Sequence, residues 1–352
     1  MSTGISWTDE TWNPVVGCTP VSAGCDHCYA GTLAATRLKH LPLYADLTDG
    51  GQFNGKVKTV PERLDNPMRW RKPRRVFVNS MSDLFHDAVP LDFIVAVFAR
   101  IWWNPHHQFQ LLTKRHARMR AIMSEIEARL REMERDLALV DCPTPLVWPL
   151  PNLWLGVSVE NQRWADIRIP VLLDTPAAVR WISAEPLLGP IDLVGGGTSQ
   201  KYWLTGEPTW GPEYPEPTSP TGIPVRDLVT KPGLDWVVVG GESGKDARPM
   251  PAGWARSLRN QCEDAGIPFH FKQWGEWASL VRLANADGTG HTDPWADREP
   301  DAYVCERTGR VVDEATAERE VGSWTGVYRV GTKASGRELD RRIWDQYPAV
   351  TA

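Results

Sequence analysis

Three of the six cysteines stand close together near the N-terminus, where Cys18, Cys25 and Cys28 have the spacing C-x6-C-x2-C. Glycines and a proline in and beside this segment allow it to curl around a bulky ligand, and a helix expected directly after it would place positive potential beside the thiolates. Three thiolates can hold three irons of a [4Fe–4S] cluster, whereas a cluster used only for electron transfer normally has four protein thiolates. A missing fourth ligand leaves one iron open to a cosubstrate, and radical chemistry with S-adenosylmethionine (SAM) uses such an open iron.

Zinc is the competing interpretation of the same loop. His27 would complete a Cys3His site, but it stands inside the C-x2-C pair, where simultaneous ligation with both neighbours is awkward. Structural zinc sites more often show two separated cysteine pairs, and no second C-x2-C follows in this sequence. A chance cluster of three structural thiols is the remaining alternative. The ligand count favours the iron–sulfur site.

Seven short apolar runs are distributed along the chain, each rich in β-branched or aromatic residues and followed by a polar or glycine-containing tail. Continuous apolar runs of this length are typical of strands buried on both faces, as in parallel sheets. The predicted strands are Thr11–Gly17, Arg75–Ser80, Gln108–Thr113, Leu153–Val159, Val179–Ala184, Leu234–Gly240 and Pro268–Gln273.

Helical patterns lie between most of these strands, at Tyr29–His40, Leu91–Trp102, 114–140 and about Ala252–Ala265. In the third, Glu125–Arg129 and Glu127–Arg131 have the spacing of i,i+4 ion pairs on the exposed side. The alternation of strand and helix predicts right-handed βαβ units and a parallel sheet. Periodicity alone leaves open whether six or seven units form a full or partial barrel or an open doubly wound sheet. In either case, ligands are expected at the carboxyl ends of the strands.

Two segments interrupt the alternation. Residues 195–232 are rich in Gly, Pro, Thr and Ser, which predicts a long irregular insertion in the barrel domain of residues 1–277. After Trp277 the composition becomes polar and rich in turn residues. We therefore expect residues 278–352 to form a small C-terminal extension packed on the barrel.

The net charge of −5 provides no global attraction for nucleic acid. Basic residues nevertheless gather locally, and such clusters fit a solvated surface as well as a phosphate-facing one. No apolar run is long enough to span a membrane, and the polar, acidic segment from Met1 to Glu10 lacks the features of a secretory signal. We therefore expect a cytoplasmic protein. The local clusters of basic residues are two. The first contains Lys56, Lys58, Arg63, Arg69, Arg71, Lys72, Arg74 and Arg75, and the second contains Lys114, Arg115, Arg118 and Arg120.

The chain resembles a phage-associated, three-cysteine-motif family of radical-SAM-like proteins. The resemblance extends over nearly the whole sequence. The matching phrases are Ile5-Ser-Trp-Thr-Asp-Glu-Thr-Trp-Asn-Pro-Val-Val-Gly-Cys18, Cys25-Asp-His-Cys-Tyr29, Asn79-Ser-Met-Ser-Asp-Leu-Phe85, Leu112-Thr-Lys-Arg115, Leu155-Gly-Val-Ser-Val-Glu-Asn161, Ser183-Ala-Glu-Pro-Leu-Leu188, Gly240-Gly-Glu-Ser-Gly244, Phe271-Lys-Gln-Trp-Gly-Glu-Trp277 and Gly331-Thr-Lys-Ala-Ser-Gly-Arg-Glu-Leu-Asp340.

This resemblance implies a TIM-barrel-like, parallel (β/α)6–7 barrel of radical SAM type, with a [4Fe–4S] cluster on Cys18, Cys25 and Cys28. It implies an enzyme that cleaves SAM and produces a 5′-deoxyadenosyl radical, which abstracts hydrogen from a substrate. The spacing differs from C-x3-C-x2-C, the commonest in radical SAM enzymes. No catalytic residue beyond the cluster ligands is identified.

Radical SAM barrels place SAM-binding groups at their strand ends, and the resemblance transfers these roles to the predicted strand tails. Each residue also has a simpler interpretation as a helix cap or turn residue. Asn79, Ser80, Ser82 and Asp83 are expected near the methionyl amine. Ser158, Glu160, Asn161, Ser183 and Glu185 are expected near the ribose or carboxylate. Gly240, Gly241 and Glu242 are expected near adenine, and Lys114, Lys272 and Gln273 are candidates for carboxylate or substrate contacts.

The alternative function is a non-enzymatic iron–sulfur or zinc module that contacts nucleic acid through its basic segments. For the enzyme, the phage association suggests a DNA or tRNA base as substrate, and a peptide or small metabolite is the alternative. The 195–232 insertion would cover the substrate or receive a partner protein. A nucleophilic hydrolase is disfavoured, because G-x-S-x-G, H-E-x-x-H and P-loop phrases are absent from the sequence.

Overall fold

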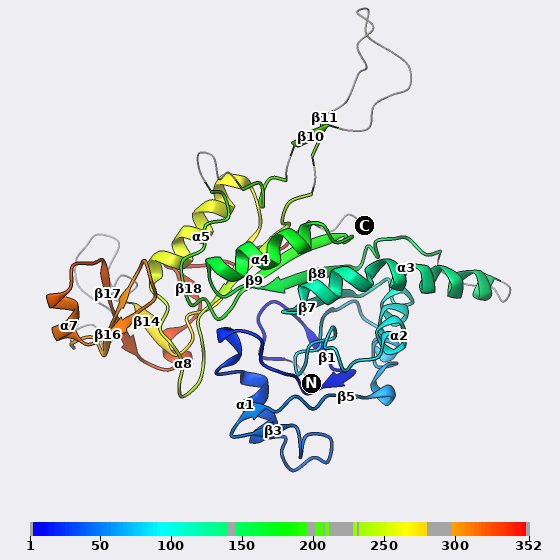
Figure 1. The fold of residues 1–352 in the computed structure, drawn as a ribbon, viewed down its shortest axis with the longest axis horizontal. Helices are drawn as coiled ribbons and strands as arrows, with labels where there is room; N and C mark the ends of the chain where they lie inside the picture. The colour runs from blue at the N-terminus through cyan, green and yellow to red at the C-terminus, as the bar shows by residue number, and fades with distance from the viewer. Residues whose placement is uncertain are drawn as a thin grey trace, which may run out of the picture.

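A seven-stranded parallel sheet forms the centre of the molecule in the computed structural model, which describes residues 3–138, 145–195, 201–206, 208–210, 228–230, 232–279 and 298–349. The order of strands in the sheet follows their order in the chain (Figure 1). The strands are β1 (Glu10–Trp12), β6 (Arg75–Val78), β7 (Gln108–Thr113), β8 (Leu153–Ser158), β9 (Val179–Ala184), β12 (Trp236–Gly240) and β13 (Phe269–Gln273).

This monotonic order decides between the two architectures that the sequence left open. A doubly wound sheet reverses its strand order at a switch point, and no reversal occurs here. Right-handed crossovers between successive neighbours place the connecting helices on one face, so the sheet curls into a half-barrel. The α/β class and the parallel, partial-barrel sheet are therefore confirmed.

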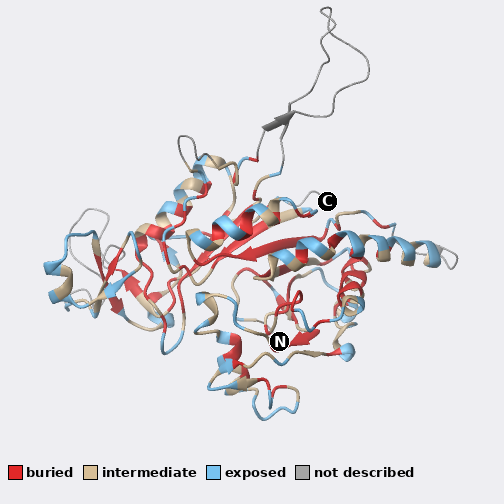
Figure 2. Cartoon of the chain, viewed as in Figure 1, coloured by how far each residue is buried: buried red, intermediate tan, exposed pale blue. Residues whose placement is uncertain are grey.

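Four helices pack along the outer face of the curled sheet: α2 (Leu91–Trp102), α3 (His116–Ala138), α4 (Gln162–Leu173) and α5 (Ala252–Ala265). Figure 2 shows α3, α4 and α5 buried on their inner sides and exposed on their outer sides, whereas α2 is buried over most of its surface. On the exposed side of α3 the predicted pairs are present, with Arg129 3.9 Å from Glu125 and Arg131 2.8 Å from Glu127. In α5, Cys262 is fully buried.

Aromatic side chains fill the inner face at the amino ends of the strands. Trp7, Trp154, Trp181 and Trp236 are at most 2% exposed, and ring centroids such as those of Trp181 and Trp236 are 5.2 Å apart. Gly156 makes room for Trp181, because a Cβ at this glycine would lie 2.5 Å from the indole ring. This end of the half-barrel is therefore packed solid, which leaves the carboxyl ends of the strands for a ligand.

The first predicted strand, Thr11–Gly17, is broken in the structure. β1 ends at Trp12, and Val15–Val16 forms a separate strand, β2, that pairs antiparallel with β5 (Lys58–Thr59). Pro14 lacks the N–H that a continuous ladder requires. The Asn13 carboxamide oxygen meanwhile accepts a hydrogen bond from the Met81 N–H at 3.0 Å. The prediction of one continuous strand was wrong for this reason.

Residues 29–75 form a lobe between β1 and β6, drawn in blue below the sheet in Figure 1. The lobe has its own small core, which includes Leu47 and Phe53. The helix predicted for Tyr29–His40 is shorter in the structure and ends at Ala35. The lobe contains α1 (Tyr29–Ala35), β3 (Thr48–Asp49), β4 (Gln52–Phe53), β5, and the short 3-10 helices η2 (Pro61–Arg63) and η3 (Pro67–Arg69).

The C-terminal part forms a second, antiparallel sheet beside α5 (Figure 1). It contacts the half-barrel through the Trp277 indole, which donates to the Ala247 carbonyl at 2.6 Å. The elements are β14 (Trp277–Ser279), β15 (Ala302–Cys305), β16 (Val311–Val312), β17 (Trp324–Arg329), α7 (Glu314–Arg319), α8 (Thr332–Ser335), β18 (Glu338–Leu339) and β19 (Arg342–Ile343).

Most of the predicted 195–232 insertion lies outside the described residues. Within it the structure describes one antiparallel pair, β10 (Pro208–Trp210) with β11 (Leu228–Thr230). Across the described ranges, no helix combines the length and apolar character needed to cross a bilayer.

Candidate functional site

A cavity of about 300 Å³ opens at the carboxyl ends of the parallel strands. Its size falls at the lower end of the range of small-molecule and cofactor sites. Ile5, Trp7, Phe77 and Leu112 form its apolar floor, and the cysteine loop borders its mouth. The cavity therefore lies where a parallel barrel presents its ligands.

Most residues predicted from the strand tails line this cavity together. Three do not: Glu160, Asn161 and Gly240. Asn161 caps α4 by accepting from the Trp164 N–H at 3.3 Å, which is the simpler role that its residue type suggested. The lining residues among those predicted are Cys18, Cys25, Cys28, Asn79, Ser80, Ser82, Asp83, Lys114, Ser158, Ser183, Glu185, Gly241, Glu242, Lys272 and Gln273.

The cysteine loop is fastened at its first half to the ends of three strands. The Thr19 hydroxyl is 2.8 Å from Nε2 of His86, and Arg115 donates to the Thr19 carbonyl at 3.2 Å. The Ser22 hydroxyl donates to Oε1 of Glu160 at 2.5 Å. These contacts fix the loop over the mouth from the β6, β7 and β8 sides.

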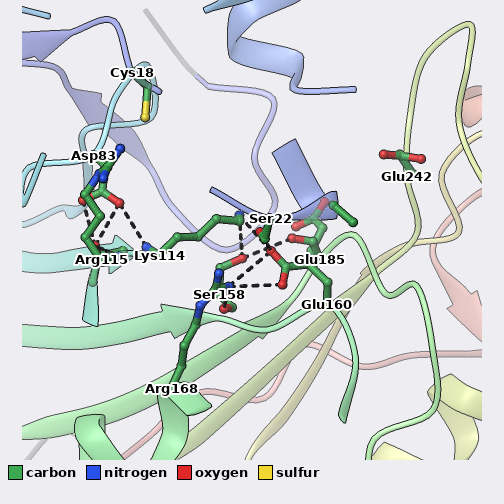
Figure 3. A network of polar contacts seen from close by, with 12 residues as sticks. Cys18, Ser22, Asp83, Lys114, Arg115, Ser158, Glu160, Arg168, Glu185 and Glu242 are labelled. Atoms are coloured by element: carbon green, nitrogen blue, oxygen red, sulfur yellow. Dashed lines mark hydrogen bonds and ion pairs between the residues drawn. The ribbon is translucent and has the colours of Figure 1, made fainter. Parts of the chain in front are cut away.

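Glu160 and Arg168 form a fully buried ion pair beneath the loop, with 3.1 Å between Arg168 Nη1 and Glu160 Oε2 (Figure 3). Lys114 lies 3.7 Å from the same carboxylate and donates to the Ser158 hydroxyl at 2.9 Å. The loop approaches Glu160 closely at Gly24, where a Cβ would lie 2.5 Å from the Glu160 side chain. Glu160 thus supports the loop from below.

The second half of the loop is fastened from the opposite side by Arg248. Its guanidinium donates to Glu242 at 2.7 and 2.9 Å, to Asp26 at 3.2 Å and to the Ala23 carbonyl at 2.8 Å. Burial alone would raise the pKa of Glu242, but the hydrogen bonds from Arg248 outweigh burial and hold that pKa below its usual value. Figure 3 shows Glu242 across the opening from Cys18 and Asp83.

All three thiols of the loop are free and line the cavity. Burial, followed by the nearby Asp83 carboxylate, raises the pKa of Cys18 to about 12. In the part of the chain that the structure describes, no group of three or more His, Cys, Asp or Glu side chains is arranged to hold a metal ion. A metal or cluster on these cysteines would therefore require the loop to bring the sulfurs together and release their protons.

Asn79 is the clearest unmet polar group in the cavity. It is 3% exposed, and neither the carboxamide oxygen nor the nitrogen has a hydrogen-bond partner among the described residues. Its backbone φ of 61° is unusual for a residue other than glycine. An unpaired buried amide costs roughly 1–3 kcal/mol per group. Asn79 therefore presents both a donor and an acceptor to a ligand.

Most other polar side chains around the cavity have partners within the protein. Lys272 Nζ is 2.6 Å from Glu185 Oε1, and Asp83 accepts two contacts from the Thr113 hydroxyl at 2.7 and 2.9 Å. Gln273 donates to the Ser243 hydroxyl at 2.8 Å. Gly240, which was expected near adenine, instead lies against Glu185, where a Cβ would be 3.2 Å from the carboxyl carbon.

Several residues that build the site were not found from the sequence. Ser22, Arg168 and Arg248 carry no local pattern, because their partners are distant in the chain. Tyr29 was expected only as the first residue of a helix and was given no role in the site. Its side chain is 52% exposed beside the cavity, and its hydroxyl donates to the Ser80 carbonyl at 2.6 Å. Its position directly after Cys28 was the available signal.

The chain belongs to the family described as protein of unknown function (DUF5131), whose profile matches residues 2–348. No curated protein and no solved structure matches the chain.

Proposed function

We propose that this protein is a radical SAM enzyme that holds a [4Fe–4S] cluster on Cys18, Cys25 and Cys28 and binds SAM in the adjoining cavity. One observation carries the proposal. A loop with three free thiols is fastened, from both sides, over a cavity at the carboxyl ends of a curled parallel sheet.

The donor set fits a site-differentiated cluster. Among the described residues, Cys18, Cys25 and Cys28 are the cysteines that border the cavity, so the protein offers three thiolates and leaves one iron without a protein sulfur. Pro20, Val21 and Ala23 are exposed, so the loop can move outward without meeting the core. Arg248 and Ser22 would hold its ends during that adjustment.

The cavity also suits the polar groups of SAM. Asn79 would donate to the methionyl carboxylate and accept from the methionyl amine, which would satisfy the buried amide. The Lys272 ammonium would bind the carboxylate or a ribose oxygen after separating from Glu185. When bound, a reduced cluster would supply the electron that cleaves SAM to methionine and the 5′-deoxyadenosyl radical.

The remaining residues would exclude water and fix orientation. The aromatic floor, with Trp7 and Phe77 in contact at a centroid distance of 4.7 Å, closes the cavity from below. A closed, apolar floor protects a reactive intermediate from solvent.

The direct test is anaerobic reconstitution with iron and sulfide, followed by incubation with dithionite and SAM. The proposal predicts 5′-deoxyadenosine and methionine in the product mixture. A cluster-loaded protein that yields no 5′-deoxyadenosine under several reductants would contradict it. The C262A variant is a matched control, since Cys262 is a buried thiol away from the loop.

A second candidate is a non-catalytic zinc site on the three cysteines and His27. His27 Nδ1 lies 3.2 Å from Glu242 Oε2, and a metal-bound histidine commonly donates its other ring N–H to a carboxylate. Metal analysis separates the two candidates. One zinc per chain without acid-labile sulfide supports the zinc site, and iron with equimolar sulfide supports the cluster.

A further inference from the structure

The lobe of residues 29–75 carries a charge opposite to that of the whole chain. It contains ten Lys and Arg residues and four Asp and Glu residues, giving a net charge of +6. The complete chain has a net charge of −5, so the other residues together carry −11. Such a local concentration of positive charge in an acidic protein is the electrostatic footprint of a site for a polyanion.

Four of these basic residues are already in ion pairs, and a fifth, Arg63, donates to the Asn13 carbonyl at 3.2 Å. Lys56 and Lys58 contact Asp46, Arg74 contacts Glu10, and Arg75 contacts Asp9. Five others are exposed and form no ion pair with any described residue: Arg37, Lys39, Arg69, Arg71 and Lys72. Because no residue in the described ranges neutralises them, these five are available to an external anion.

The lobe adjoins the cysteine loop at the end that contains α1 and β4. α1 begins at Tyr29, directly after Cys28. The Gly55 N–H donates to the Cys18 carbonyl at 3.1 Å, and the Gln52 amide donates to the Asp26 carbonyl at 2.6 Å. The later part of the lobe reaches the amino ends of the strands, where the Trp70 and Pro67 carbonyls lie 3.2 Å from His106 and His107, directly before β7. A nucleic-acid strand bound to residues 69–72 must therefore extend along the lobe to reach the cavity.

Tyr29 adds an aromatic surface where the lobe meets the cavity. Its side chain lines the cavity and is 52% exposed, and its hydroxyl is held by the Ser80 carbonyl. Exposed positive charge, combined with an exposed aromatic ring, is the arrangement by which proteins bind single-stranded nucleic acid. An anionic membrane would instead require an apolar face, but the exposed apolar residues of the lobe, Leu41 and Met68, are isolated ones on separate segments.

We propose that the 29–75 lobe binds the sugar–phosphate backbone of a single-stranded nucleic acid and that Tyr29 stacks on a base beside the cavity. The role of this nucleic acid as a substrate rests on the proposed function, because only the proposed radical SAM reaction would act on it. A base must leave its duplex stack to reach a cavity of this kind, which is why a single strand is the expected ligand. Binding itself requires neither cluster nor SAM.

The expected salt dependence follows from the number of free basic residues. For single strands, log Kobs falls with log salt by about 0.7 for each neutralised phosphate. Five contacts therefore predict a slope of about −3.5, and loss of three contacts predicts a slope of about −1.4.

The test measures fluorescence anisotropy of a labelled single-stranded DNA or RNA of about 20 nucleotides, longer than the site of one small binding domain, titrated with the native chain at several salt concentrations. The R69Q/R71Q/K72Q variant should reduce the slope by about 2 and weaken binding at low salt at least tenfold. The Y29A variant should weaken binding without changing the slope. The control R120Q/R135Q/K333Q removes three exposed basic residues outside the lobe and should behave as wild type.

Three results would overturn the proposal: no oligonucleotide binding by the native chain at low salt, equal losses in the lobe and control variants, or binding to phosphatidylserine vesicles but to neither oligonucleotide. Thermal unfolding of each variant is measured to check that the variant keeps its fold. Because cluster and SAM are absent from this assay, its failure would leave the 5′-deoxyadenosine test unaffected. Failure of that test would likewise leave the binding result standing.

Discussion

Arg248 provides the sharpest test of how the cysteine loop is held. Its side chain joins Glu242, at the end of β12, to Asp26 and Ala23 in the loop. In R248Q the Glu242 carboxylate, whose side chain is 4% exposed, would keep the Arg248 main-chain N–H and His27 as partners and lose the guanidinium. Removing one partner of a buried pair costs about 3–5 kcal/mol. Arg248 is itself 29% exposed, so we expect a loss of about 2 kcal/mol.

Urea unfolding measures this loss as a lower midpoint with an unchanged slope. R131Q is the matched control, because it breaks the exposed i,i+4 pair with Glu127 and should cost only about 0.3–0.5 kcal/mol. The double variant E242Q/R248Q should be less destabilised than the sum of its single variants, since the buried charge is then absent. Equal destabilisation by R248Q and R131Q, or strictly additive effects of E242Q and R248Q, would show that Arg248 does not hold the loop through Glu242.

The contact between Arg248 and Glu242 also predicts how the free energy of unfolding depends on pH. The folded-state pKa of Glu242 is lowered from 4.5, so its contribution to stability is present above pH 4.5 and is lost as the pH falls through the folded pKa. The difference between wild type and R248Q in free energy of unfolding should therefore shrink below pH 4.5. A difference that grows with falling pH would contradict this sign.

Three further predictions concern the cavity. C18A, C25A and C28A should each lose most bound iron on anaerobic reconstitution, whereas C262A should retain it; iron and sulfide assays check this, and iron retained by all three single variants would contradict the assignment. N79G should raise the free energy of unfolding by roughly 1 kcal/mol, because it relieves the positive φ and removes an unpaired amide. The same variant should weaken SAM binding at least fivefold in equilibrium dialysis, and unchanged binding would show that Asn79 does not contact SAM. W236A should cost about 3–5 kcal/mol in urea unfolding, because its side chain is fully buried in the aromatic cluster that packs against Trp7 of the cavity floor. A cost under about 1 kcal/mol would show that this cluster is not tightly packed.

Much of the central sheet was predictable because its strands are buried on both faces. Runs such as Leu153–Val159 and Leu234–Gly240 contain few polar residues and end in polar tails, and each contains a strand of the sheet. Their order in the sheet was not predictable, because periodicity reports burial and carries no information on neighbours. Helix α4 was not predicted, since buried Arg168 and the internal Pro170 disguise its pattern.

The residues of the candidate site were likewise predictable only in part. Strand tails such as Asn79, Ser158 and Lys272 meet in one cavity because parallel strands present their carboxyl ends together. The supports of the loop depend on long-range contacts that leave no local signal. Arg248 and Asp26, for example, are 222 residues apart in the chain.

The most direct test of the central claim is electron paramagnetic resonance of the reconstituted, dithionite-reduced protein with and without SAM. Three protein thiolates predict a [4Fe–4S] signal that changes when SAM is added, because SAM reaches the iron that the protein leaves open. A signal that is identical with and without SAM, or a protein that binds zinc and takes up no iron and sulfide, would contradict the account.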